Sequence, residues 1–222
     1  MEEYKQIAKD GEAELIIRAS RFICALKKID TEEEALAFIQ EKKKEHKKAT
    51  HNCSAFLIGE HDHIQRAHDD GEPSGTAGVP MLEVLKKNNL HNVVAVVTRY
   101  FGGVKLGAGG LIRAYSSAVS NALNHVGIMM HTKQFIVTIR VPYTLSGKFD
   151  YFLSHSPYRL LHTDYASDIT YTCGILSRLL SDFEQDITQQ FNGSLAFVIE
   201  EEAYIDLPLE KETLHLSDEH FE

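Results

Sequence analysis

Long apolar runs are missing from this 222-residue sequence, and none approaches the roughly 20 residues that a membrane-spanning helix requires. The first 14 residues, MEEYKQIAKDGEAE, are charged and lack the apolar core of a secretory signal, so the chain is expected in the cytoplasm. The three cysteines, Cys24, Cys53 and Cys173, lie far apart and form no Cys-x-x-Cys motif, which is typical of reduced thiols. These absences argue against a disulfide framework and predict a globular protein without membrane association.

Positive charge is also scarce, because 23 Lys and Arg face 32 Asp and Glu, for a net charge of −9. The deficit is confined to one part of the chain: residues 1–130 contain 17 basic and 17 acidic side chains, whereas residues 131–222 contain 6 and 15. A neutral first part can still present a local basic face, since phosphate binding depends on where charges cluster. The acidic second part is better suited to a protein partner than to RNA.

The length exceeds the commonest domain size of roughly 100–150 residues, and the hydrophobic pattern restarts after Gly127. We therefore expect an α+β protein of two domains, 1–131 and 132–208, with a charged tail at 209–222. The second domain follows a β-α-β-β-α-β order, which is the ferredoxin-like arrangement. Its expected elements are strands at 134–143, 159–167, 168–176 and 195–208, with helices at 145–155 and 176–191.

In the first domain the segment 14–29 predicts a hairpin or a bent strand, and Thr31 with Glu34 forms a capping box that opens a helix. The run LHNVVAVVTRYF lacks alternation, so it is expected to be a strand buried on both faces. The remaining expected elements are a strand at 50–59, a long polar excursion at 60–78, and helices at 80–89 and 111–126.

The polar excursion ends in an acidic turn, HDDGEPSGTAG, at residues 68–78. Its carboxylates Asp69, Asp70 and Glu72, with the hydroxyls of Ser74 and Thr76, could hold Mg²⁺, act as acid and base, or hydrogen-bond ribose hydroxyls. The alternative is a surface turn whose side chains bond their own backbone and cap the next helix. Composition by itself favours the surface turn.

A glycine stretch, TRYFGGVKLGAGGLIRAY at residues 98–115, contains five of the fourteen glycines. It precedes a helix whose first N–H groups lie at the positive end of the helix dipole, and Lys105 and Arg113 could add charge to an anion site there. The spacing matches neither a Walker motif nor a dinucleotide-binding Gly-x-Gly-x-x-Gly. Alternatively, the glycines only allow positive φ angles and close packing of the helix against the strand. The residues expected on the anion- or RNA-binding face are Arg99, Tyr100, Gly102, Gly103, Lys105, Gly107, Gly109, Gly110 and Arg113.

Histidines and one cysteine crowd residues 46–68, and His61 and His63 could share a zinc or nickel ion on an extended segment. No fourth ligand stands at a recurring metal spacing, so no metal or cofactor site is predicted. Cys53 lies between apolar neighbours, where a buried thiol is inert, and a Ser74 nucleophile would need an oxyanion hole. No catalytic residue is predicted.

Two segments, DDGEPSGTAGVPML and NVVAVVTRYFGGVKLGAGGLIRAYSSAV, resemble the IMPACT/YigZ family over roughly residues 15–130, and the remainder resembles the small C-terminal domain of its bacterial members. The resemblance implies a first domain like the second domain of a small-subunit ribosomal protein, an α/β sandwich shared with elongation factor G and with the galactokinase and homoserine kinase group. It implies a second domain similar to the ferredoxin-like domains of elongation factor G. Eukaryotic members restrain a translational stress kinase by competing for its activating protein.

These observations lead to the hypothesis of a translation-associated regulatory protein that binds the ribosome, RNA or a phosphate through the glycine stretch. Asp69, Asp70, Glu72, Ser74 and Thr76 would form the opposite wall of the groove, and translation-factor proteins are further possible partners. Two alternatives remain open. One is an enzyme that acts on a nucleotide or small molecule at the acidic turn, and the other is a regulator that binds only proteins.

Overall fold

The computed structural model describes residues 3–59 and 61–209. It divides into two compact units, one of residues 3–130 with 208–209 and one of residues 131–207, and each is described by itself. The charged tail expected at 209–222 lies, beyond Leu209, outside the described residues. No helix within the described ranges has the length and apolarity needed to cross a membrane.

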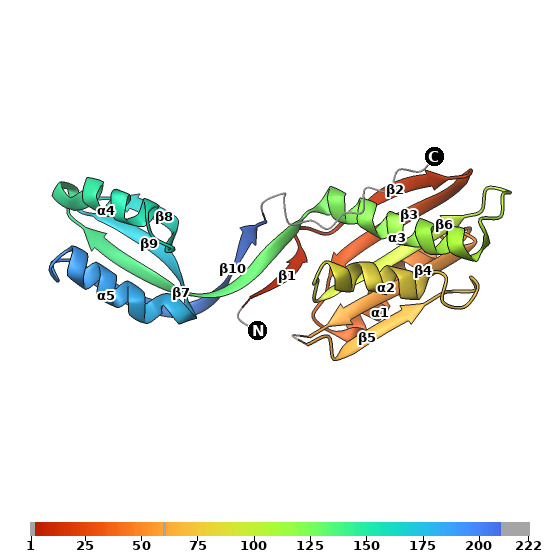
Figure 1. Cartoon of the computed structure of the whole chain (residues 1–222), viewed down its shortest axis with the longest axis horizontal. Helices are drawn as coiled ribbons and strands as arrows, with labels where there is room; N and C mark the ends of the chain where they lie inside the picture. The colour runs from red at the N-terminus through yellow and green to blue at the C-terminus, as the bar shows by residue number, and fades with distance from the viewer. Residues whose placement is uncertain (1–2, 60, 210–222) are drawn as a thin grey trace. The chain divides into compact units, whose positions relative to one another are not determined.

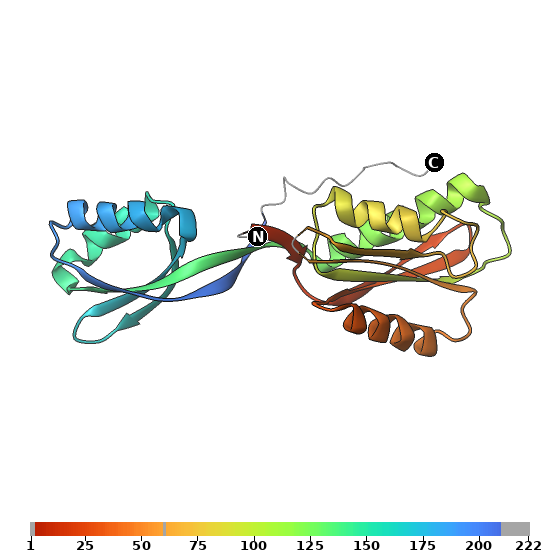
Figure 2. The same ribbon diagram turned by 90° about the horizontal axis from the view of Figure 1, so that it is seen from below.

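The first unit is built on an antiparallel sheet with the strand order β2-β3-β6-β4-β5. Helices α2 and α3 cover one face, and α1 covers the other (Figures 1 and 2). The strands are β2 (Gly11–Ile17), β3 (Ser20–Lys28), β4 (His51–Ile58), β5 (Ile64–His68) and β6 (Val93–Tyr100), and the helices are α1 (Glu32–Glu45), α2 (Gly78–Lys87) and α3 (Gly107–Val126).

Strand β6 lies at the centre of the sheet and is buried on both faces, as its unbroken apolar run predicts. Val93, Ala95 and Val97 belong to the core under α2 and α3, whereas Val94 and Val96 belong to the core under α1. Successive side chains of a strand point to opposite faces, so only a run that is apolar at every position can fill two cores. This packing confirms the expected doubly buried strand.

A capping box and a tight turn define two neighbouring elements, the start of α1 and the β2–β3 hairpin. The Thr31 hydroxyl oxygen caps α1 by accepting a hydrogen bond from the Glu34 N–H, and the Glu34 carboxylate accepts one from the Thr31 N–H. These two bonds confirm the capping box. Arg18 and Ala19 have φ angles of 44° and 66°, the left-handed conformation that a two-residue hairpin turn between β2 and β3 requires.

Two strands were not expected from the sequence. Strand β5 lies inside the segment 60–78 that we interpreted as a polar excursion, and β1 (Glu3–Ile7) lies in the charged N-terminal segment. Strand β5 lies at the edge of this sheet and pairs only with β4. Its side chains are half-buried or exposed, so the sequence of β5 lacks the apolar alternation that marks a strand. Strand β1 pairs with β7, whose first residues belong to the first unit.

The second unit follows the predicted ferredoxin-like order β7-α4-β8-β9-α5-β10. Its sheet has the order β10-β7-β9-β8, and both helices pack on one face of that sheet around Phe149 and Phe183 (Figure 2). The bounds are β7 (Ile128–Val141), α4 (Ser146–Ser154), β8 (Arg159–Tyr165), β9 (Ile169–Leu176), α5 (Leu180–Gln190) and β10 (Ala196–Pro208), and short 3-10 turns precede α4 and α5.

Candidate functional site

The acidic turn and the glycine stretch meet at one end of the first sheet. Strand β4 pairs antiparallel with both β6 and β5, which places Arg99 opposite His51 and His68 opposite Ser54. The end of β6 and the end of β5 therefore lie at the same end of the sheet, where the acidic turn leads into α2 and the glycine stretch leads into α3 (Figures 1 and 2). Two motifs about 30 residues apart in the chain become neighbours.

A buried ion pair joins the two motifs directly. The Arg99 Nη1 donates to Glu72 Oε1 over 2.6 Å, and the Tyr115 hydroxyl donates to the same oxygen over 2.8 Å. Arg99 is 5% exposed and Glu72 is 8% exposed, and the guanidinium lies over the rings of Phe22 and Phe101. Arg99 was expected to offer its charge to a bound anion, but its charge is neutralised inside the protein because it points from β6 into the core under α3.

Tyr115 also belongs to this buried cluster, and the sequence did not predict its polar role. Its position in α3 predicts only an apolar contact, yet its hydroxyl contacts both Glu72 and the Cys53 thiol. Burial raises the pKa of Tyr115, and Cys53 and Glu72 raise it further, so the phenol stays protonated and remains a donor. Burial likewise raises the pKa of the Cys53 thiol to about 12, which agrees with the expected inert cysteine.

Asp69 organises the acidic turn. Its Oδ2 accepts from the Gly75 N–H over 2.8 Å, and its Oδ1 accepts from the N–H groups of Ala77 and Gly78 at the start of α2 over 3.0 and 2.8 Å. Burial opposes its ionisation, but the three N–H donors outweigh burial and hold the pKa of Asp69 below its usual value. Asp69 therefore caps α2 from a distance, where the sequence suggested Ser74 or Thr76.

Asp70 accepts hydrogen bonds from β4 and from α1, which lie beside the turn. Its Oδ2 accepts from the Asn52 N–H over 2.7 Å, and its Oδ1 accepts from Lys43 of α1 over 2.6 Å. Its own φ angle is 47°, and its carbonyl oxygen lies 2.8 Å from His51 Nδ1. The carboxylate thus fastens the turn to β4 and α1.

The two hydroxyls of the acidic turn differ from each other. Thr76 is 5% exposed and donates to the Pro73 carbonyl oxygen over 2.6 Å, so it closes the turn. Ser74 is exposed, and no described residue hydrogen-bonds its side chain. Of the five residues expected to form a groove wall, Ser74 is the one whose side chain is open to a ligand.

Tyr100 points away from the α3 side of the sheet. Its hydroxyl lies 3.0 Å from His46 Nδ1 at the end of α1, and the Arg21 guanidinium lies over its ring. Strand alternation places Arg99 and Tyr100 on opposite faces of β6, so a pair adjacent in sequence cannot serve one site. Tyr100 therefore does not join Lys105 and Arg113, contrary to the expectation.

The glycines of the glycine stretch differ in how strictly the structure requires them. Gly102 passes so close to the β2–β3 turn that a Cβ there would lie 2.0 Å from the Ala19 carbonyl oxygen. Gly103 and Gly107 have φ angles of 88° and 71°, which other residues rarely adopt. A Cβ at Gly109 would meet no atom within 4 Å, so neither backbone conformation nor packing requires glycine there. Gly110 is intermediate, because a Cβ there would lie 3.1 Å from its nearest neighbour.

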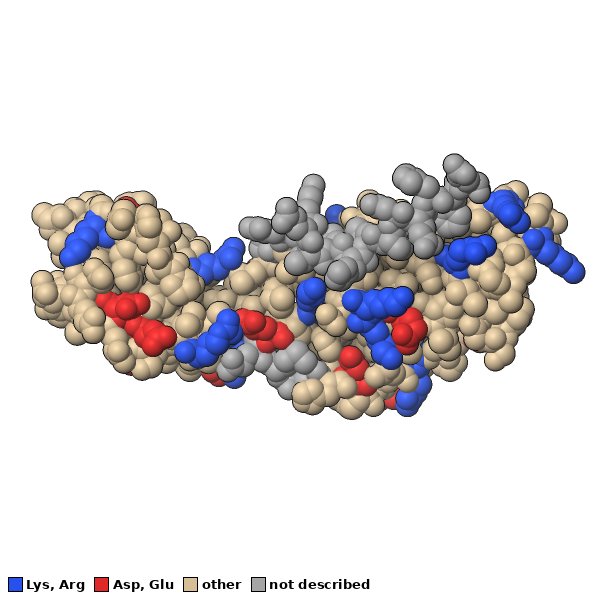
Figure 3. Space-filling view, in the orientation of Figure 1, with Lys and Arg blue, Asp and Glu red and all other residues tan. Residues whose placement is uncertain are grey.

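The start of α3 lacks the caps that the other helices of this unit have. No side chain of the described residues caps it, its first turn contains no acidic residue, and residues 107–109 are exposed. Lys105 and Arg113 are also exposed, and neither has a hydrogen bond or an ion pair with any described residue. Helix α3 contains no Asp or Glu at all, and on the α2 and α3 side of this unit basic side chains are spread over the surface beside a few acidic ones (Figure 3). We call residues 101–110 with Arg113 the glycine-loop face.

The histidine region, residues 46–68, contains a turn at Asp62. Asp62, between His61 and His63, has a φ angle of 49°, and its Oδ1 lies 2.7 Å from His91 Nδ1, so the backbone turns here instead of continuing as the extended segment that a shared metal ion would need. Within the described ranges, no three or more His, Cys, Asp or Glu side chains are grouped to hold a metal ion.

Comparison with known proteins gives a consistent result over both units. The Impact N-terminal domain matches residues 18–123, and a domain of unknown function, DUF1949, matches residues 139–194. The chain is 50% identical over 190 residues to the IMPACT family member YvyE of Bacillus subtilis, covering 86% of this chain and 88% of that protein. It is 33% identical over 188 residues to the IMPACT family member YigZ of Escherichia coli, covering 84% and 92%. A crystal structure described as a hypothetical protein matches 96% of this chain and 100% of its own, with a TM-score of 0.57 and 30% identity.

Proposed function

The chain belongs to the IMPACT family, and we propose that it is a translation-associated regulatory protein that binds ribosomal RNA, or a nucleotide-like phosphate, through the glycine-loop face. Regulation of translation is the process that the family resemblance implies. The acidic second unit would hold a protein of the translation machinery, and the site of action would be the cytoplasm.

One observation carries this proposal: the first turn of α3 is exposed and uncapped, and two unpaired cations accompany it. Free N–H groups at a helix start carry a partial positive charge and bind anionic oxygen, an effect worth about 0.3–1 kcal/mol at an exposed site. Lys105 offers a mobile ammonium, whereas Arg113 offers a planar guanidinium suited to phosphate. Both charges are available because no described acidic residue pairs with them.

The acidic turn supports a binding role better than a catalytic one. Both carboxylate oxygens of Asp69 and of Asp70 accept hydrogen bonds from internal donors, and Glu72, which is buried, accepts two on Oε1. A general base or a metal ligand would need an oxygen that is free to face a substrate. In this proposal the turn shapes and stabilises the edge of the glycine-loop face.

A regulator that binds only proteins is the second candidate, and exposed apolar side chains on the same face favour it. Phe101 and Val104 are each 47% exposed, and Ile112 is 41% exposed. Large apolar side chains at a solvent-exposed surface often mark protein contacts. This candidate predicts recovery of the same partners after RNase treatment.

The test is binding of the purified chain to isolated ribosomal subunits over a series of salt concentrations. The variant Lys105→Ala/Arg113→Ala should weaken binding and reduce the slope of log K against log salt by about 1–2, because each phosphate contact contributes a slope of about 0.7–0.9. The matched control is Lys47→Ala/Lys48→Ala, which removes two exposed lysines beyond α1. Arg99 is not a suitable probe because its loss would leave the Glu72 carboxylate buried without its cation.

Binding that does not depend on salt, or that both double variants weaken equally, would remove the glycine-loop face from the proposal. Binding that survives RNase treatment and is lost in Phe101→Ser but not in Lys105→Ala/Arg113→Ala would support the protein-only candidate.

A further inference from the structure

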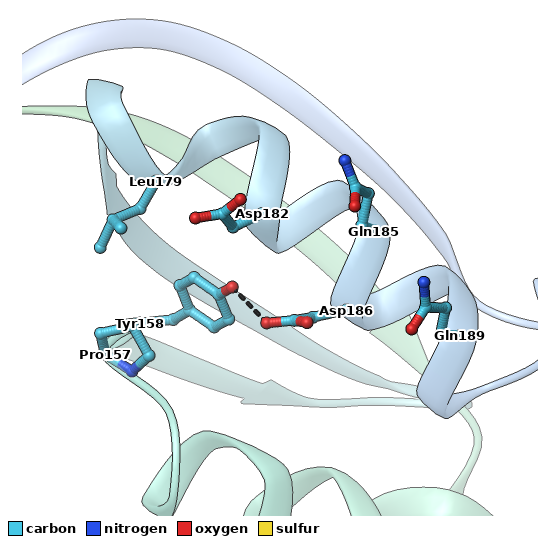
Figure 4. Close-up of a pocket in the computed structure, with 7 residues that line it drawn as sticks. All are labelled: Pro157, Tyr158, Leu179, Asp182, Gln185, Asp186 and Gln189. Atoms are coloured by element: carbon cyan, nitrogen blue, oxygen red, sulfur yellow. Dashed lines mark hydrogen bonds between the residues drawn. The ribbon is translucent and has the colours of Figure 1, made fainter.

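The second unit contains a cavity of its own. It has a volume of about 320 Å³ and is bordered by α5, the residues just before β8 and the 3-10 turn that precedes α5 (Figure 4). The residues that line it are Pro157, Tyr158, Leu179, Asp182, Gln185, Asp186 and Gln189. Four of the seven come from α5 at spacings of three and four residues, so the polar stripe of this helix faces the cavity while Phe183 and Ile187 fill the core.

The two carboxylates of the cavity differ in their hydrogen bonding. Asp186 Oδ2 accepts a hydrogen bond from the Tyr158 hydroxyl over 2.6 Å, as Figure 4 shows, and the Tyr158 ring packs edge-on against Phe183. Asp182 has no hydrogen bond or ion pair with any described residue, and its carboxylate is exposed at the cavity. One carboxylate is therefore fixed, and the other is available to a ligand.

The lining of the cavity carries acidic side chains but no basic ones. No Lys or Arg lines it, and helix α5 contains Asp182, Glu184 and Asp186 but no basic residue. Two basic residues border α5 without lining the cavity: Arg178 lies in the 3-10 turn before the helix, and Lys148 of α4 donates to the Gln190 carbonyl oxygen at its other end. The cavity therefore presents a negative charge that a cationic group would complement.

We propose that this cavity receives one arginine side chain of a protein partner. The Asp182 carboxylate would accept from the guanidinium, the side-chain oxygens of Gln185 and Gln189 would accept its remaining N–H groups, and Pro157 and Leu179 would contact the methylene stem. The volume is near the lower limit of ligand pockets, about 300 Å³, and the lining is mostly polar, so one side chain fits better than a cofactor. RNA is disfavoured because phosphates would face the carboxylates. The inference rests on the proposed function only in taking the second unit's partner to be a protein.

The experiment is an NMR titration of the full ¹⁵N-labelled chain with the blocked tripeptide acetyl-Gly-Arg-Gly-amide. The matched probe carries citrulline, which has nearly the shape of arginine but no charge, and a second probe carries lysine. We expect the arginine peptide to shift the amide signals of residues 182–189 and of Tyr158 with millimolar affinity, and the citrulline peptide to leave them unchanged. The shifts should shrink as salt is added, because the contact is electrostatic.

Asp182→Asn should weaken the arginine peptide about fivefold, the upper end for an exposed ion pair. Glu184→Gln is the matched control, because it removes one charge from the same helix at a position that does not line the cavity. Gln185→Glu adds a carboxylate to the lining and should tighten binding. A change in affinity that is equal for Asp182→Asn and Glu184→Gln would overturn the proposal.

Equal shifts with citrulline, equal shifts with lysine, or no shifts at these residues would also overturn it, as would larger shifts with an RNA oligonucleotide. The Lys105→Ala/Arg113→Ala variant should respond to the arginine peptide as the unmodified chain does. Failure of the glycine-loop proposal and failure of this one are thus distinguishable.

Discussion

The acidic turn and the glycine stretch lie at the same end of one sheet and each leads into a helix, yet the two motifs use their polar groups in opposite ways. The acidic turn engages its carboxylates internally, since Asp69 accepts from three N–H groups and Glu72 accepts from Arg99 and Tyr115. The start of α3 has no cap among the described residues, and Lys105 and Arg113 have no ion pair there.

This difference assigns the acidic turn to the stability of the fold and the glycine-loop face to ligand binding. A polar group that is satisfied by its own fold contributes to stability, and removing it leaves a buried partner unpaired. A polar group that is left open contributes little to the fold and remains available to a ligand. Substitutions in the acidic turn should therefore change stability, whereas substitutions on the glycine-loop face should change binding.

The largest expected effect is that of Arg99→Ala. It should lower the free energy of unfolding by about 3–5 kcal/mol, because the Glu72 carboxylate would remain buried without its cation. Chemical denaturation measures the loss, and Lys105→Ala, at an exposed and unpaired position, should change the stability by less than about 0.5 kcal/mol. A loss below about 1 kcal/mol for Arg99→Ala would mean that the ion pair is not a structural contact. The double variant Arg99→Ala/Glu72→Ala should be destabilised by less than the sum of the single variants.

A smaller effect, with a characteristic pH dependence, is expected for Asp69→Asn. The variant should lose about 1–2 kcal/mol at pH 7, because charge-assisted bonds to the Gly75, Ala77 and Gly78 N–H groups become neutral ones. The pKa of Asp69 is lowered in the folded protein, so the contribution of its carboxylate is complete above the unfolded pKa of about 3.9 and is lost as the pH falls through the lower folded value. The difference between the two proteins should therefore shrink below about pH 4.

Urea unfolding at a series of pH values from about 7 to about 3 checks this dependence. Glu41→Gln, at an exposed position of α1 with no described partner, is the control and should leave the curve unchanged. A difference between Asp69→Asn and the unmodified chain that stays constant over the whole series would contradict the role assigned to Asp69.

The smallest effect on stability, and one of opposite sign, is expected for Gly109→Ala. Alanine should stabilise the chain by about 0.5 kcal/mol, because Gly109 is helical and a Cβ there meets no atom within 4 Å. The same Cβ should weaken ribosomal or phosphate binding, since it would stand beside the open N–H groups. Thermal unfolding and the binding assay measure the two effects. Gly102→Ala should instead destabilise the chain, because its Cβ would collide with the Ala19 carbonyl oxygen.

Strong local patterns predicted much of the architecture. The capping box of Thr31 and Glu34, the doubly apolar β6 and the strand-helix alternation of the second unit each depend on residues close together in the chain, and each is present in the structure. Strand β5 escaped prediction because an exposed edge strand carries few apolar residues. Tyr115 escaped prediction as a hydrogen-bond partner because its acceptor, Glu72, is 43 residues away.

The sequence by itself determined most of the elements and their order, the family and the composition of both motifs, since these depend on local periodicity, capping and residue type. Only the tertiary structure decided which charges stay available. The β6 pleat sends Arg99 into the core under α3 and Tyr100 toward α1, and strand pairing brings Glu72 to Arg99. A charge is neutralised by whichever partner lies within about 4 Å, and that partner comes from another element of the fold.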